Sequence, residues 1–452
     1  MIEVIFGAFS IIALLLFCLA PPAYAVAITC FVGWLLLPVG NFPAGSAEAV
    51  FPYWITGAAV PSDMLLTKMW WPPVVALLGA LVTDRKTLAQ FRPGWMDVPM
   101  GLWCLWPLVQ SAVVESPDPK PWIATLYLAA AWGTPWLLGR AYFAGFEGGR
   151  RLMISLAAGL VVIVPIALIE GILGPRVYGW FYQPHPFRFD GLERYIGFRP
   201  LAFFENGNQY GIWVAATALA GLWLSRPTSQ KGNRVWRILV AVLAAIVAFA
   251  SQSVGAILLL CVGLALSWSL GHHVLRRALL IGLVLILTAG AIYLSGVTPL
   301  RSFAENTAVG RQVVDIVRLS GRGSFTWRIA RDQAALNLVD QHLILGSGRW
   351  DWWRENGQRP WGLGLLLIGQ FGIFGFVLAF SPLLMTIMCT FSRKQVQCWR
   401  QRSNPPLAAI VVMATADALL NSFFFYPAIL AAGALATRED KGELSRLNDV
   451  HA

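Results

Sequence analysis

Long apolar runs separated by short polar intervals form the main pattern along this chain. A run of about 17 to 25 apolar residues is the length that an α-helix needs to cross a bilayer. Such runs lie near residues 2–19, 22–39, 65–82, 95–112, 121–139, 152–172, 209–225, 236–251, 253–270, 278–295, 361–390, 406–420 and 423–437. The pattern predicts an all-α fold, a polytopic transmembrane helical bundle of about 12 or 13 spans, with residues 1–452 as a single membrane domain.

Two polar intervals are long enough to carry structure of their own, namely residues 173–208 and 297–360. Five short basic intervals, at 84–92, 140–151, 226–237, 272–277 and 393–402, fall together on the other side of the predicted bundle. The positive-inside rule makes that side the cytoplasm. The two long intervals are therefore predicted to be exported loops, the second of them carrying short helices.

Composition agrees with a membrane protein and narrows the choice of partners. The chain is 57% hydrophobic and 13% charged, against about 25% charged residues in ordinary soluble domains. The net charge of +11 lies largely in short loops between spans. No soluble basic domain accompanies it, so membrane lipids rather than nucleic acid are the expected partner. The six cysteines are scattered, which predicts neither a disulfide framework nor a metal site.

Arginine without lysine is the shared feature of the two long loops. The longer loop contains Arg301, Arg311, Arg318, Arg322, Arg328, Arg331, Arg349, Arg354 and Arg359. The shorter loop contains Arg176, Arg188, Arg194 and Arg199, alternating with aromatic residues. Either basic residue attracts an anion, but a planar two-point grip on phosphate or carboxylate selects the guanidinium group. The loops are predicted to bind an anionic group, with lipid head-group contact as the alternative.

Residues 324–343 of the longer loop are predicted to form an amphipathic helix with Ser324 as its N-cap. One face carries Trp327, Ala334, Leu338, Val339 and His342. Another face carries Arg328, Arg331 and Asp332. Such a helix would lie on the membrane or over a cavity.

A polar turn between two predicted spans, at Ser251, Gln252 and Ser253, falls on the exported side. Polar groups at membrane depth need partners within the protein or in a wet cavity. The turn is therefore predicted to line the floor of the same site as the two arginine-rich loops.

Polar residues also lie within or beside other predicted spans. Glu170 ends its span close to the shorter loop, and pairing with Arg176 is favoured over a functional role. Asp417 and Asn421 stand one helical turn apart, which favours a structural hydrogen-bond pair over a cavity wall.

Short motifs beside the spans carry a family resemblance. They are the GR-x-YF turn at Gly139 to Phe143, the stretch RPLAFFENGNQYG, the turn SQSVGA, and TWRIARDQAALNLVDQHLILGSG followed by GQFGIFG. Together with the layout over nearly the whole chain, they resemble the O-antigen ligase and polymerase superfamily. These are multi-span enzymes that handle lipid-linked glycans at the outer face of the bacterial inner membrane.

The resemblance implies a multi-pass glycosyltransferase of the inner membrane that needs no metal or other cofactor. It would act on polyprenyl-pyrophosphate-linked glycans as a polysaccharide polymerase or ligase, with export or chain-length proteins as partners. Arg199 and Arg328 look similar to the family arginines that hold the lipid pyrophosphate, and Arg194 and Arg322 complete the predicted binding set. Gly346 and Gly348 look similar to the family turn that closes the helix.

Two departures from the family pattern concern the proton acceptor and the phosphate site. The outer turn has Ser253, Val254 and Gly255 where the family has Ser-Arg-Gly. Trp361 and Gly362 stand where the family has a His-Asn pair. The predicted catalytic residues are therefore His342, Asp351 and Glu355, with Asp332, His185 and Glu205 as further exported candidates.

Two other functions fit the same sequence. One is a transporter or flippase for a lipid-linked or anionic solute, which would place ionisable residues near the middle of the membrane and break helices in related positions. The other is a non-catalytic member of a polysaccharide export system, since the family histidine is replaced.

Overall fold

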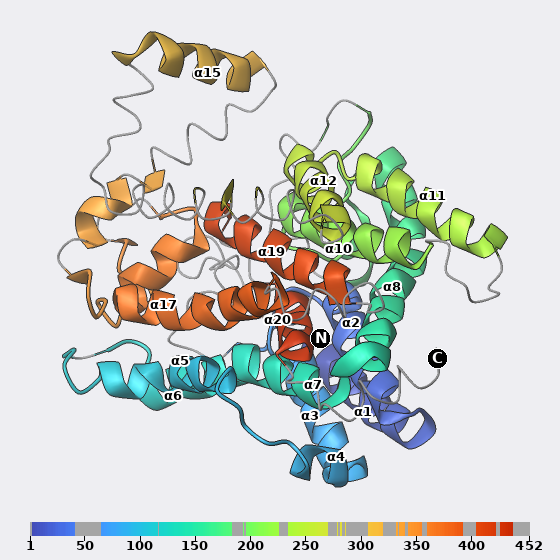
Figure 1. Ribbon diagram of the computed structural model, residues 1–452, viewed down its shortest axis with the longest axis horizontal. Helices are drawn as coiled ribbons and strands as arrows, with labels where there is room; N and C mark the ends of the chain where they lie inside the picture. Colours follow the sequence, from blue (N-terminus) through green and yellow to red (C-terminus); the bar gives the residue numbers. More distant parts are fainter. Residues whose placement is uncertain are drawn as a thin grey trace.

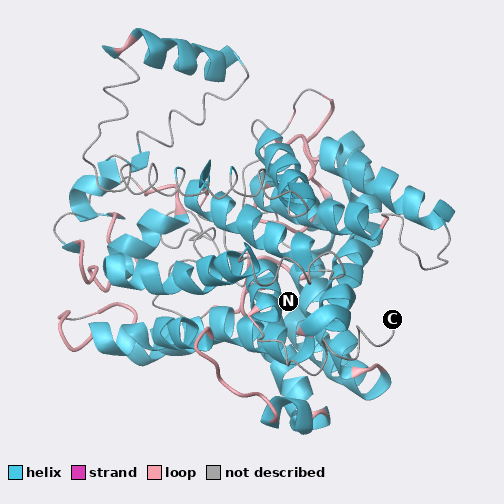
Figure 2. Ribbon diagram, in the orientation of Figure 1, coloured by secondary structure: helices cyan, strands magenta, loops and turns pink. Residues whose placement is uncertain are grey.

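The computed structural model describes residues 2–40, 65–115, 117–182, 193, 196–225, 234–269, 278, 281–282, 285, 306–319, 331–332, 334–339, 342–354, 359–391, 404–421 and 425–436. Helices and their connections make up this described part, with no strand and only isolated bridges between extended residues (Figures 1 and 2). The helices are α1 (Ile2–Leu19), α2 (Pro22–Leu36), α3 (Trp71–Thr83), α4 (Arg85–Ala89), α5 (Asp97–Gln110), α6 (Pro121–Leu128), η2 (Ala129–Gly133), α7 (Thr134–Tyr142), α8 (Gly145–Leu173), α9 (Val177–Phe181), α10 (Gly207–Leu224), α11 (Arg234–Ala250), α12 (Val254–Ser269), α15 (Ala308–Leu319), α17 (Leu363–Phe391), α19 (Asn404–Leu420) and α20 (Tyr426–Leu435). The all-α prediction is confirmed for this part of the chain.

Three helices are long and apolar enough to cross a membrane: Ile2–Leu19, Glu147–Leu173 and Leu363–Thr390. Shorter apolar helices of 10–17 residues include Pro22–Leu36, Trp71–Thr83 and Pro405–Leu419. This supports a membrane protein, whereas the count of about 12 or 13 spans stays a prediction.

Some element bounds differ from those expected. The span predicted from residue 65 begins as a helix only at Trp71. Pro72 lies in its first turn, where backbone N–H groups have no partner within the helix and proline has none to satisfy. The span predicted over 121–139 is built from α6, the π-helical segment η2 and α7. The predicted span at 278–295 lies largely outside the described residues.

Helix α10 is the centre of the fold. Its residues from Gly207 to Gly221 are buried almost without exception, and α8, α11, α12 and α19 pack around it (Figure 1). A helix that is mostly apolar all round is expected to be buried in a core in this way, and its buried polar residues include Gln209 and Thr217. The chain just before α10 is thereby anchored deep in the molecule.

Close backbone contacts explain two glycines, Gly139 of the GR-x-YF motif and Gly433 of α20. A Cβ added to Gly139, in α7, would lie 2.1 Å from the carbonyl oxygen of Leu430 in α20. A Cβ on Gly433 of α20 would in turn lie 2.3 Å from the carbonyl oxygen of Trp136. Small residues allow two helices to approach this closely, so the GR-x-YF motif has a packing role here.

Helix α17 is interrupted at Gly372, which has φ 72 and ψ 180. The turn at 343–348 fills this interruption, because the N–H of Ile373 donates to the carbonyl of Leu343 at 2.9 Å. A Cβ on Gly346 would lie 2.4 Å from the backbone nitrogen of Gly372. The Gly-x-Gly turn and the glycine-rich span that follows it in the sequence therefore contact each other directly.

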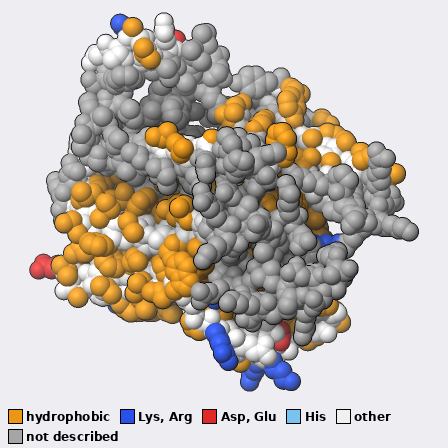
Figure 3. All heavy atoms as spheres, in the orientation of Figure 1, with side chains coloured by type: hydrophobic (Ala, Val, Ile, Leu, Met, Phe, Trp, Pro, Cys, Tyr) orange, Lys and Arg blue, Asp and Glu red, His pale blue; other side chains and the backbone are white. Residues whose placement is uncertain are grey.

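Apolar and basic side chains lie in different regions of the face shown in Figure 3. Hydrophobic side chains cover the part of the view occupied by α5, α6 and α17, while Lys and Arg gather over α4 (Figure 3). The exposed apolar residues include Leu102 and Leu105 of α5, Leu126 of α6 and Phe374 of α17. A broad exposed apolar area of this kind is expected of a protein surrounded by lipid.

Segments predicted to share a side of the membrane contact one another. On the predicted exported side, Gly40 pairs with Thr67, and Asp118 pairs with Arg349. On the opposite side, Arg140 forms an ion pair with Asp97 at 2.9 Å and donates to the carbonyl of Ala436 at 3.1 Å. These contacts lie between segments of the same predicted side, and the assignment of loops to the two sides stays a prediction.

The amphipathic helix predicted over 324–343 is described, as helix, at residues 331–332 and 334–339. Its buried stripe consists of Asp332, Ala335, Leu336 and Val339. The apolar members pack against Leu365 and Ile368 of α17. The placement of Asp332 on a separate basic face was wrong, because its carboxylate lies on the packed side and accepts the N–H of Trp361 at 2.6 Å.

Candidate functional site

Arg199 lies against the N-terminus of α10. Asn206 caps this helix, its Oδ1 accepting the N–H groups of Asn208 at 2.8 Å and Gln209 at 3.1 Å. Arg199 is only 7% exposed, and its Nη2 donates to Oδ1 of Asn208 at 3.1 Å. A Cβ on Gly207 would lie 2.2 Å from Nε of Arg199, so glycine is required for the guanidinium to rest here.

A chain of side-chain hydrogen bonds leads from Arg199 to the end of α19. Nδ2 of Asn208 donates to Oδ1 of Asn421 at 3.3 Å. The indole N–H of Trp361 donates to the same oxygen at 3.4 Å. Nδ2 of Asn421 donates to Asp417 at 2.7 Å, which confirms the predicted hydrogen-bond pair.

A second arginine joins this network from the longer loop. Arg359 is 3% exposed, and its guanidinium lies 5.1 Å from the centre of the Trp361 ring, a cation–π contact. Trp361 therefore connects Arg359 with Asn421. We refer to Arg199, Asn208, Arg359, Trp361 and Asn421 as the polar cluster. It joins the two loops that the sequence singled out for their arginines.

Lys68 and Glu205 are two fully buried ionisable residues beside the polar cluster, both 0% exposed. Nζ of Lys68 donates to the carbonyl of Phe203 and lies 4.4 Å from the centre of the Phe204 ring. Glu205 accepts a hydrogen bond from Nε2 of Gln209 at 3.5 Å. Burial raises the pKa of Glu205 to about 8, although the positive charge of Lys68 and the Gln209 hydrogen bond oppose this shift.

Sequence reasoning missed Lys68, which fell inside a run taken for a membrane span. A lone ionisable residue in an apolar run is a signal of function or of a buried partner. Its position in the turn before α3 explains how the charge is accommodated, since a backbone carbonyl and two aromatic rings surround it.

Glu170 holds the segment that carries Arg199. Its carboxylate accepts N–H groups from Val177 at 3.2 Å, Leu201 at 2.8 Å and Ala202 at 2.6 Å. The prediction that Glu170 would pair with Arg176 was wrong, because the carboxylate turns inward to the backbone and Arg176 is exposed. Ala202 has a positive φ of 50, a strained conformation that these hydrogen bonds help to hold.

The turn at Ser251 to Ser253 contacts the same segment, and its place on the floor of a binding site stays a prediction. Nε2 of Gln252 donates to the carbonyl of Ile196 at 2.6 Å and to that of Phe198 at 3.3 Å. Ser251 and Ser253 are buried. The turn thus supports the loop just before Arg199, although its described partners are protein backbone.

The predicted catalytic residues are dispersed. His342, expected on an apolar face, is exposed, because the helix ends before it and a tighter turn begins. Asp351 is bound by Arg349 at 3.3 Å and Arg354 at 4.0 Å. No hydrogen bond or ion pair found among the described residues brings either of them to Arg199. The other candidates, Glu355, His185, Arg194, Arg322 and Arg328, lie outside the described residues.

Asp351 belongs to a separate aromatic cluster on the first turns of α17. Trp350 and Trp353 pack with Leu366 of that helix. The Arg354 guanidinium lies 4.9 Å from the centre of the Trp350 ring. With two arginines around it, the Asp351 carboxylate has a structural ion-pair role in this arrangement.

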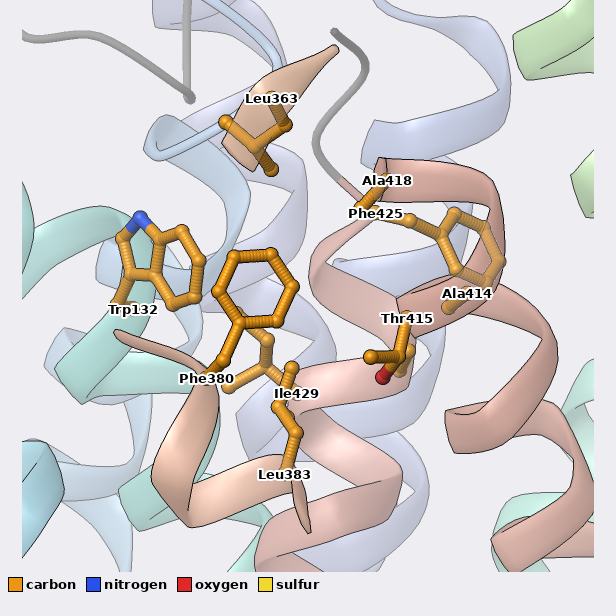
Figure 4. A pocket seen from close by; sticks show the side chains of 10 residues that line it. Trp132, Leu363, Phe380, Leu383, Ala414, Thr415, Ala418, Phe425 and Ile429 are labelled. Carbon is orange, nitrogen blue, oxygen red and sulfur yellow. The ribbon is translucent and has the colours of Figure 1, made fainter. Parts of the chain in front are cut away.

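A small apolar cavity lies between α17, α19, α20 and η2 (Figure 4). Its volume is about 30 Å³, and its lining includes Trp132, Phe380 and Phe425. The single lining hydroxyl, on Thr415, donates to the carbonyl of Val411 at 2.7 Å and so is already paired. The lining is therefore apolar, and its one hydroxyl is already paired within α19.

Comparison with known proteins adds no relative. No family model matches the chain, and no curated protein matches it at a significant level. Within the described part of the chain, no group of three His, Cys, Asp or Glu residues could hold a metal ion. Any functional assignment therefore depends on the polar cluster and its surroundings.

Proposed function

We propose that this protein is a membrane glycosyltransferase that acts on polyprenyl-pyrophosphate-linked glycans, as a polymerase or a ligase, at the outer face of the inner membrane. The proposal rests on the family resemblance of the motifs and on the arrangement of two arginines. Its substrate is a lipid-linked oligosaccharide, and its proposed partners are proteins of polysaccharide export or chain-length control.

The convergence of Arg199 and Arg359 is the observation that carries the proposal. They come from the two arginine-rich loops and are joined through Asn208, Asn421 and Trp361. Arg199 lies at the N-terminus of α10, and Trp361 lies two residues before α17. Two buried guanidinium groups in one polar cluster favour an anionic ligand here.

Glycosyl transfer from such a donor leaves negative charge on the departing pyrophosphate. Preorganised arginines and backbone N–H groups stabilise charge of this kind in the transition state. The acceptor hydroxyl needs a proton acceptor, and the indole of Trp361 cannot serve, since its nitrogen is a donor only. His342, Asp351 and Glu355 stay the predicted candidates for this role.

Binding of the lipid pyrophosphate tests the proposal directly. Purified protein in nanodiscs would be titrated with undecaprenyl pyrophosphate, and with undecaprenyl monophosphate for comparison. Arg199→Lys and Arg359→Lys keep the charge but lose the planar fork. A charge-assisted hydrogen bond contributes about 1.5–3 kcal/mol, so affinity for the pyrophosphate should fall about 10- to 100-fold.

Arg176→Lys is the matched control, because Arg176 comes from the same loop and is exposed. It should bind as the unmodified protein does. Melting temperatures measured without ligand would establish that each variant is folded. Equal affinity of all four proteins for undecaprenyl pyrophosphate would refute the proposed role of the polar cluster.

A transporter for a lipid-linked or anionic solute is the second candidate. Two observations favour it, namely the buried ionisable pair Lys68 and Glu205 and the interruption of α17 at Gly372. Liposomes that contain the purified protein separate the candidates. A transporter moves a labelled lipid-linked sugar across the bilayer unchanged, whereas a transferase joins it to an acceptor.

A further inference from the structure

Helix α15 is an amphipathic helix with a defined beginning. Oγ1 of Thr307 accepts the N–H of Gly310 at 2.9 Å, and the carbonyl of Thr307 accepts the N–H of Arg311 at 3.0 Å. In its sequence AVGRQVVDIVRL, positions 309, 313, 316 and 317 share one face at 100° per residue. Positions 311, 315 and 318, which hold Arg, Asp and Arg, share the opposite face.

This helix stands apart from the rest of the molecule. It does not pack extensively on any other described helix, and Figure 1 shows it set off from the helical body. Val309 on the apolar face is 62% exposed. A 12-residue helix is only marginally stable alone in water, so its apolar face needs an apolar environment.

A bilayer surface is the environment that fits α15. With 12 residues, the helix is about 18 Å long, too short to cross a hydrocarbon core of about 30 Å. Short helices that carry arginine on the polar face and branched apolar residues on the other lie in the plane of the membrane interface. Other helices of this chain are long and apolar enough to span that membrane.

The charge of α15 favours an anionic surface. By sequence position, Arg311 and Arg318 outnumber Asp315 on the polar face, and in the flanking sequence Arg301 and Arg322 outnumber Glu305. A basic residue near an anionic bilayer contributes about 1 kcal/mol of attraction. A second copy of the chain is a weaker fit, since stable protein interfaces use about 20–30 residues a side.

We propose that α15 lies in the head-group region of an anionic bilayer, with the face of positions 309, 313, 316 and 317 toward the acyl chains. It thereby anchors the 297–360 loop to the membrane surface at a point remote from the polar cluster. This anchoring does not depend on the proposed glycosyl transfer and would serve a transporter equally.

Site-directed spin labelling of the full chain tests the anchor. Single cysteines would replace Val309 on the apolar face and Asp315, which is exposed on the opposite face. The six native cysteines would be changed to serine, and folding would be checked by melting temperature. Labels would be read in nanodiscs of phosphatidylglycerol and phosphatidylcholine, and in phosphatidylcholine alone.

We expect the label at 309 to be accessible to oxygen and shielded from a water-soluble nickel complex, and the label at 315 to show the reverse. The depth of the label at 309 should be smaller without the anionic lipid. Equal water access at both positions would overturn the anchor. Dipolar coupling between labels of two copies would also overturn the anchor, and so would shielding of both labels from both reagents. Either result would indicate protein contacts. Equal depth in the two lipid mixtures would overturn the anionic preference.

Discussion

Replacement of Gly346 by alanine should destabilise the protein, because the turn that carries Gly346 fits directly against the interruption of α17. Gly346 has φ 79, a left-handed conformation that costs an L-residue about 1–2 kcal/mol. The new Cβ would lie 2.4 Å from the nitrogen of Gly372 and 2.5 Å from the carbonyl oxygen of Gln370. Both neighbours are backbone atoms, so relief requires the turn to move away from α17.

That movement would strain two hydrogen bonds between the turn and α17. The N–H of Ser347 donates to the carbonyl of Gly369, and that of Gly348 to the carbonyl of Gln370, each at 2.9 Å. Each bond contributes about 0.5–1.5 kcal/mol net. Together with the cost of the left-handed backbone conformation for alanine, the loss in the free energy of unfolding is about 2–5 kcal/mol.

Thermal unfolding of the purified protein in detergent, followed by tryptophan fluorescence, would measure this loss as a decrease in Tm of several degrees. Gly101→Ala is the control, since Gly101 lies within α5 and no atom is within 4 Å of its added Cβ. Alanine favours a helix over glycine by up to about 1 kcal/mol, so the control should keep or raise Tm. Equal melting of the two variants would refute the assigned contact between the turn and α17.

Two further predictions use the same melting assay. Burial raises the pKa of Glu205 from 4.5 to about 8, so the folded protein holds this proton more tightly than the unfolded chain. Its stabilising contribution is complete below about pH 4.5 and is lost as pH rises through about 8. Tm should fall between about pH 4.5 and 7, because burial lowers the pKa of neighbouring Lys68 to about 7 and its titration opposes the fall at higher pH. Glu205→Gln should flatten this part of the profile, whereas an unchanged slope would exclude Glu205 as the cause. Asn421→Ala removes the hydrogen bonds to Asp417, Asn208 and Trp361. The loss should be about 1–3 kcal/mol, and an unchanged Tm would contradict the assigned network.

Local features of the chain could be predicted from the sequence. The apolar run at 2–19 is observed as α1 (Ile2–Leu19), and the run at 406–420 as α19 (Asn404–Leu420). The pair Asp417 and Asn421 was expected from its spacing of one helical turn. Helix length and spacing along one helix depend on residues close together in the chain, so the pattern contains the information needed.

The composition of the polar cluster was decided only by tertiary structure. Arg199 was singled out in the sequence, but Arg359 was one of nine arginines in its loop. Lys68, which lies beside the cluster, was hidden in an apolar run. Asn208 meets Asn421 across 213 positions of sequence. Such a contact depends on how α10, α17 and α19 pack, and no local pattern encodes it.

The partners of buried polar groups show most clearly what only the tertiary structure decided. Glu170 was expected to pair with Arg176 nearby, yet it accepts N–H groups from residues up to 32 positions away. Asp332 was assigned to a basic face, yet it caps the backbone before α17. The sequence by itself determined where apolar helices form, because burial of apolar surface follows residue type. The partner of each buried polar group depends on which backbone donors the fold brings within hydrogen-bond distance, and only the packed structure sets that distance.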